Sequence, residues 1–188
     1  MRICKDIRNA CSGTEMVRLY CKANPNYHIA VREFVGSGPC IVSEDPNDDS
    51  TIWVKDDKMA YYFDLEGGFS LVHKETKQAL KTPPLAGAQM LLAPYNPVKL
   101  DTSIIWYMSG PKAGGYHIIY NDPKDDSIVM HALRCMKCDR MEPCPEGEGR
   151  IKENTLLSVL PNKTGKDGVP DVAVNQLWRM IPAKKGCM

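Results

Sequence analysis

A large charge imbalance, a long apolar run and catalytic motifs are all missing from this chain of 188 residues. The formal net charge is only +1, so no overall field attracts nucleic acid or an anionic membrane surface. No stretch is long and apolar enough to span a bilayer, and residues 1–16 carry several charges instead of the apolar region of a secretory signal. We therefore expect no nucleic-acid or membrane partner, and we expect the protein to stay in a reducing compartment.

Residue patterns typical of catalysis are equally scarce. The four histidines stand outside any recognisable nucleophile or acid–base motif. Paired carboxylates such as Asp48-Asp49 and Asp125-Asp126 fall in predicted turns, where Asp is common for backbone reasons. No glycine-rich phosphate loop joins a strand to a helix. The sequence therefore favours a protein that is not an enzyme.

Three tryptophans are present, and each closes a segment of similar layout. Each segment reads as strand, turn, strand, break, strand, proline-containing loop and a final strand with the tryptophan. Apolar and polar residues alternate in these runs, which predicts half-buried strands. Threefold recurrence indicates that Trp53, Trp106 and Trp178 lie in the core instead of stacking on a ligand. The predicted strands cover residues 17–21, 27–31, 40–43, 51–55, 69–72, 78–81, 90–93, 104–108, 116–120, 127–130, 155–159 and 174–180.

Twelve short strands in three units, without a sustained helical period, predict an all-β fold, the β-trefoil. This fold is a closed barrel capped by hairpins around one pseudo-threefold axis, and closure removes the edge strands of an open sheet. A β-sandwich also uses short strands, but it gives no reason for a threefold tryptophan. We expect an N-terminal tail at 1–15, one domain at 16–183 with a Cys-, Pro- and Gly-rich insertion at 134–153, and a C-terminal tail at 184–188.

Several stretches resemble the ricin B-like lectins, in particular the plant Euonymus-lectin type. They include VRLYCKANPNY at residues 17–27, YNP at 95–97 and NQLW at 175–178. The resemblance covers about residues 16–183. It implies a β-trefoil that binds glycans or glycoproteins without catalysis, in the cytoplasm and nucleus of plant cells, with stress-linked expression.

The resemblance also implies a sugar site in the last repeat. That site combines an Asp, an aromatic residue and an Asn-Gln pair, and these positions fall on His131, Val159, Asn175 and Gln176. Neutral His131 offers one acceptor where an ionised Asp offers two oxygens, and Val159 has no aromatic face. We therefore expect monosaccharides to bind weakly. The alternative is a degenerate trefoil that has lost sugar binding and serves as a protein-interaction scaffold.

The amides of Asn175 and Gln176 each donate and accept hydrogen bonds, so they suit sugar hydroxyls. They would equally satisfy backbone groups within their own repeat. For Gln176 we favour the structural role, and for Asn175 both roles stay open.

Eight cysteines in a reducing compartment indicate thiols or metal ligands before disulfides. Cys135, Cys138 and Cys144 lie in the insertion, and thiolates two residues apart can hold one zinc tetrahedrally, with His131 or Cys187 as a fourth ligand. The alternative is a surface loop with reduced thiols and no metal. No other cofactor is indicated.

Overall fold

The computed structural model describes twelve strands and three short helices. No helix among the residues that the structure describes has the length and apolar character needed to cross a membrane. The described residues are 14–32, 38–43, 45, 47–122, 124–132, 151, 154–161 and 176–183.

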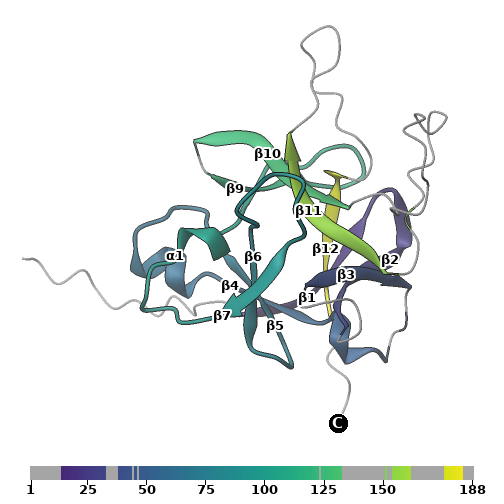
Figure 1. Ribbon diagram of the computed structural model, residues 1–188, viewed down its shortest axis with the longest axis horizontal. Coiled ribbons are helices and arrows are strands. Elements are labelled where there is room, and N and C mark those ends of the chain that lie inside the picture. Colours follow the sequence, from purple (N-terminus) through teal and green to yellow (C-terminus); the bar gives the residue numbers. More distant parts are fainter. Residues whose placement is uncertain are drawn as a thin grey trace, which may run out of the picture.

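The strands fall into three consecutive units of four, which confirms the threefold pattern of the sequence. Figure 1 shows these units, coloured purple to blue, teal, and green to yellow, around a common centre. The first contains β1 (Glu15–Cys21), β2 (Asn24–Val31), β3 (Pro39–Ser43) and β4 (Trp53–Asp56); the second contains β5 (Ser70–His73), β6 (Gln78–Lys81), β7 (Leu91–Pro94) and β8 (Tyr107–Met108); the third contains β9 (Ile119–Asp122), β10 (Asp125–Ala132), β11 (Thr155–Pro161) and β12 (Trp178–Pro182).

Six strands close a barrel. The first and last strands of each unit pair antiparallel at its tryptophan, through Val17↔Trp53, Phe69↔Trp106 and His117↔Trp178. Between units, β4 pairs with β5, β8 with β9, and β12 returns to β1. The middle strands form the hairpins β2–β3, β6–β7 and β10–β11, which cap one end. The fold is therefore a β-trefoil, as the sequence predicts.

The three tryptophans occupy equivalent places in this barrel. Their exposed fractions are 0%, 0% and 1%. Each indole Nε1–H donates to a carbonyl oxygen of the second strand in its own unit. The acceptors are Ile29 at 3.0 Å, Leu80 at 2.9 Å and Met130 at 3.0 Å. Each tryptophan thus joins its barrel strand to its own hairpin, and the prediction of core positions is confirmed.

The register also aligns further core residues by the pseudo-threefold axis. Two positions after the residue that pairs with each tryptophan lie Leu19, Leu71 and Ile119, all fully buried. Together with the tryptophans they fill the barrel in layers, and neighbours in this cluster extend into the hairpins. Burial of such large side chains is the main stabilising contribution to the domain.

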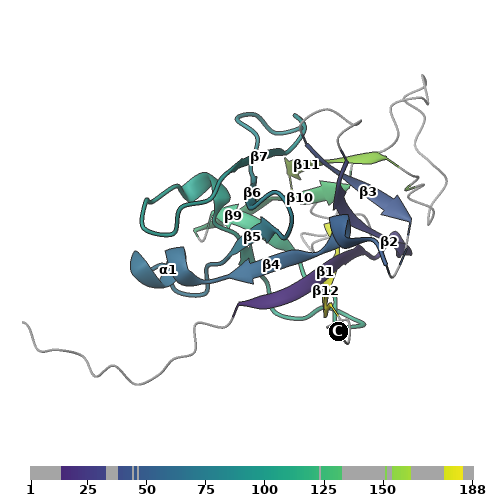
Figure 2. The ribbon, with the colours of Figure 1, turned by 90° about the horizontal axis from the view of Figure 1, so that it is seen from below.

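Local structure differs from the prediction before each tryptophan. We expected a strand on both sides, but Trp53 and Trp178 begin β4 and β12. A single helical turn precedes the first two tryptophans, η1 (Asp49–Thr51) and η2 (Thr102–Ile104). The short helix α1 (Lys58–Tyr62) after β4 was also not predicted, and it lies at the end of β4 in Figure 2. Alternation of apolar residues cannot distinguish one such turn from a strand, because short runs satisfy both periods.

The predicted insertion at 134–153 needs one correction. Its residue Ile151 is only 7% exposed and belongs to the main core cluster with the tryptophans. A Cys-, Pro- and Gly-rich insertion predicts an exposed loop that the barrel does not need, and the burial of Ile151 contradicts that prediction for this residue. The rest of the insertion, residues 1–13 of the N-terminal tail predicted at 1–15, and the C-terminal tail predicted at 184–188 lie outside the described residues, whereas Glu15 begins β1.

Candidate functional site in the last repeat

The hairpin β10–β11 holds two of the four residues assigned to the sugar site. Its register pairs Met130 with Val159 and His131 with Ser158. Met130 is fully buried and Val159 is 4% exposed, and both belong to the main core cluster. The side chain of Val159 therefore faces the barrel and offers no surface to a ligand. The side chain of His131 lies outside the described part of the structure.

Of the two amide residues before Trp178, the structure again describes the side chain of only one. Gln176 is 0% exposed, which is the burial that a structural role requires. Asn175 lies outside the described residues. The segment is fixed at its end by a backbone hydrogen bond from the Lys22 N–H to the Leu177 carbonyl oxygen, at 2.8 Å.

One neighbour of this segment had no signal in the sequence. Tyr116 is partly buried and packs on the small cluster that contains Leu177. The ammonium of Lys22 lies 5.7 Å from the centre of its ring. Tyr116 and Trp178 are far apart in the chain, and the pairing of His117 with Trp178 brings the aromatic ring beside the segment that precedes Trp178.

The first two repeats use the equivalent positions differently. Three positions before each tryptophan, Ser50 and Ser103 stand where the last repeat has Asn175. Asp48 accepts from the Ser50 N–H at 3.0 Å and from its hydroxyl at 2.5 Å. Asp101 accepts from Ser103 in the same way, at 3.0 Å and 2.5 Å. In both repeats the polar groups are satisfied within the turn.

The pKa values of Asp48 and Asp101 agree with their role as hydrogen-bond acceptors within these turns. Partial burial acts to raise the pKa of Asp48, but hydrogen bonds from Ser50 and the charge of Arg32 outweigh it, so the pKa lies below its usual value. Arg32 donates to the carboxylate at 2.6 Å. Partial burial also acts to raise the pKa of Asp101, and the bonds from Ser103 again lower it overall. These carboxylates stay ionised and cap their turns. In the sequence, an Asn-Gln pair before the tryptophan occurs in the last repeat alone.

Metal ligation and thiol chemistry find no support among the described residues. They contain no group of three His, Cys, Asp or Glu side chains that could hold a metal ion. Cys135, Cys138, Cys144 and Cys187 lie outside them, so the zinc site stays a prediction. Burial raises the pKa of Cys21 to about 12, so its thiol remains protonated near neutral pH.

Sequence comparison agrees with this architecture. No protein-family model matches the chain. Ricin B-like lectin EULS3 of Arabidopsis thaliana is 36% identical over 177 residues, a match that covers 91% of this chain and 48% of that protein. The chain is a homologue of the plant ricin B-like lectins. Ricin B-like lectin R40G3 of Oryza sativa subsp. japonica is 32% identical over 118 residues, which covers 59% of this chain and 56% of the relative. This lectin-like chain thus spans about half the length of the curated relatives it matches.

Solved structures show the same fold. The designed threefold-symmetric protein ThreeFoil superposes with a TM-score of 0.58 at 14% identity, covering 88% of this chain and 97% of ThreeFoil. The Macrolepiota procera ricin B-like lectin, solved in complex with lactose, gives a TM-score of 0.60 at 10% identity, covering 90% of this chain and 96% of that lectin. At these identities the likeness concerns the fold alone.

Proposed function

We propose that this lectin-like module binds carbohydrate and has no catalytic role, and that it acts in the cytoplasm and nucleus of plant cells. The observation that carries the proposal is homology to ricin B-like lectins over most of the chain, with Asn175-Gln176 retained before the last tryptophan. A stress-linked role belongs to the same proposal. Structural neighbours with this fold include a lectin solved with lactose, which supports glycans as the ligand class.

The last repeat favours extended glycans over single sugars. A hydrogen bond to an ionised acceptor contributes about 1.5–3 kcal/mol to binding, and stacking on an aromatic face contributes about 1 kcal/mol. His131 and the buried Val159 supply neither of these groups. A millimolar site has only about 4 kcal/mol of binding free energy in total. We therefore expect monosaccharides to bind more weakly than millimolar, with Asn175 and neighbouring loops holding a longer glycan.

A glycan array tests the function directly. We expect the purified protein to bind a subset of oligosaccharides, and we expect the Asn175→Ala variant to bind them less well. The control is Ser103→Ala, which changes the equivalent position of the second repeat. An array without any bound glycan would refute carbohydrate binding by this chain.

Calorimetry with a gain-of-function variant tests the site itself. His131→Asp restores a two-oxygen acceptor, and we expect it to strengthen binding of lactose or N-acetylgalactosamine. Val159 should be left unchanged, because a larger side chain would overpack the core. Binding by the wild type should weaken as the pH falls through about 6.5, because protonated His131 has no acceptor. Tight monosaccharide binding by the wild type would show that the site lies elsewhere.

The burial of Val159 also supports the alternative, a trefoil that binds a protein partner and not a sugar. Zinc held by Cys135, Cys138 and Cys144 would support such a scaffold. Elemental analysis should then find about one equivalent of metal, and a chelator should lower the melting temperature. A metal-free protein with unchanged stability would refute the zinc-supported form.

A further inference from the structure

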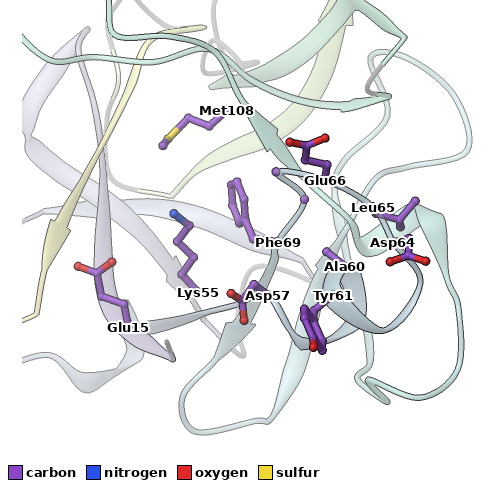
Figure 3. A pocket seen from close by; sticks show the side chains of 12 residues that line it. Glu15, Lys55, Asp57, Ala60, Tyr61, Asp64, Leu65, Glu66, Phe69 and Met108 are labelled. Carbon is purple, nitrogen blue, oxygen red and sulfur yellow. The ribbon is translucent and has the colours of Figure 1, made fainter. Parts of the chain in front are cut away.

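A pocket opens at the end of the barrel that carries no hairpins. Its volume is about 710 Å³, within the range of roughly 300–1,000 Å³ that is usual for small-molecule sites. The start of β1, the end of β4, helix α1 and the loop from α1 to Phe69 line it, and Met108 of β8 closes one side (Figure 3). The pocket thus lies at the junction of the first and second repeats.

This pocket is well separated from the last-repeat site. Glu15 begins β1 and lines the pocket, whereas Cys21 ends β1 and pairs with Trp178. Since β1 has seven residues, the two ends lie roughly 20 Å apart at the usual rise of a strand. A ligand in the pocket would therefore not contact the segment around Gln176.

The wall formed by α1 is firmly held. Met59 and Ala60 are 0% and 3% exposed, which fixes the inner face of the helix on the core. Backbone hydrogen bonds from Leu65 to Ala60 and from Gly68 to Leu65 hold the loop that follows, at 2.8 Å and 3.0 Å. A Cβ atom at Gly68 would lie 3.1 Å from the Cβ of Ala60, which shows how closely the loop approaches the helix there. The pocket is preformed.

The outer face of α1 carries an aromatic ring to the pocket. Tyr61 is 81% exposed although it lines the pocket, and Figure 3 shows it beside Asp57 at one edge. A large exposed aromatic side chain on a rigid element is a suitable stacking surface for the apolar face of a pyranose. The ring of Phe69 is less available, since the Lys55 ammonium lies 5.0 Å from its centre.

Hydrogen-bond acceptors line other parts of the pocket, and Asp57 lies beside the Tyr61 ring in Figure 3. Glu15, Asp57, Asp64 and Glu66 line the pocket with a single opposing charge from Lys55. Within the described residues none of these four carboxylates takes part in an ion pair or a side-chain hydrogen bond, and Asp57 does not cap α1 with its side chain. Ionised carboxylates accept from sugar hydroxyls through two oxygens each. The same charges repel anionic sugars, because like charges brought together without partners are unfavourable.

We propose that this pocket is a second glycan-binding site of the module, specific for neutral pyranoses, with Tyr61 as the stacking surface and Asp57 and Glu66 as hydroxyl acceptors. The proposal rests on carbohydrate binding as the function of the chain. It also specifies the ligand class as neutral glycans, because the carboxylates exclude glycans that end in sialic acid or sulfate. It also gives the module two sites at opposite ends of the barrel.

The test compares two neighbouring tyrosines on one array of neutral and sialylated oligosaccharides. Tyr62 is 63% exposed on the same helix but does not line the pocket, so Tyr62→Ala is the matched control for Tyr61→Ala. We expect Tyr61→Ala to weaken binding of the best neutral oligosaccharide by about three- to tenfold, and Tyr62→Ala to leave it within about twofold. Circular dichroism verifies that both variants are folded.

A charge variant tests the specificity. Wild-type protein should bind lactose with higher affinity than sialyllactose. Glu66→Gln removes one negative charge from the pocket, so it should reduce this difference in affinity. Amide resonances of residues 57–69 should shift when lactose is added to labelled protein.

The outcomes separate the two proposals. If no glycan binds, the proposed function and this site fall together. If neutral glycans bind the wild type and Tyr61→Ala equally well, the function stands and the pocket is refuted. A pocket that binds oligolysine and no saccharide would also overturn the proposal, because the carboxylates would then recognise a cation.

Discussion

Conservative replacement of each tryptophan by phenylalanine tests whether the three repeats are held in the same way. Each variant keeps an aromatic ring in the core but removes the indole N–H. The carbonyl oxygen that accepts this bond then loses its partner in a buried place, which costs about 1–3 kcal/mol. The missing second ring leaves a cavity worth roughly another 1 kcal/mol. The sites are Trp53, Trp106 and Trp178, with donor–acceptor distances of 3.0, 2.9 and 3.0 Å.

The total predicts a loss of roughly 2–4 kcal/mol in the free energy of unfolding for each variant, or about 5–15 °C in melting temperature for a domain of this size. Urea denaturation followed by circular dichroism measures it without relying on tryptophan fluorescence. Tyr62→Phe is the exposed control, expected within about 0.5 kcal/mol of the wild type. A tryptophan variant as stable as this control would refute the equivalence of its repeat.

Three further predictions concern stability. Burial lowers the pKa of His73, so the unfolded chain takes up a proton first, and stability should fall as the pH drops below about 6.5; His73→Gln should flatten this dependence in urea titrations at several pH values. Gly38→Ala should destabilise by more than about 1 kcal/mol, because the new Cβ would lie 2.5 Å from the Met90 carbonyl oxygen, whereas Gly110→Ala has nothing within 4 Å and should be neutral by calorimetry. Ile151→Ala should cost about 2–4 kcal/mol, while deletion of residues 136–148 should leave the melting temperature nearly unchanged; equal effects would contradict the assignment of Ile151 to the core.

The sequence by itself determined the class of fold and the position of the core. Alternating runs and a tryptophan at the close of each third were enough, because strand periodicity and repetition are written in the order of residues. The sequence also identified Trp53, Trp106 and Trp178 as core residues, because a core position that occurs in all three repeats gives the same residue type three times in the sequence. The motif of Asn175-Gln176 with Trp178 also indicated the family, because its residues are neighbours in the chain and need no folding to be recognised.

Tertiary structure alone decided which side chains reach a surface. The family resemblance placed Val159 in a sugar site, but its pairing with Met130 turns it into the core. Ile151 lies in a polar insertion and is nevertheless buried, and Tyr61 lies in an apolar run and is nevertheless exposed. Burial depends on the partners that barrel closure supplies, and those partners are distant in the chain. The pocket between the first two repeats has the same origin, because β1, α1 and β8 meet only when the barrel closes.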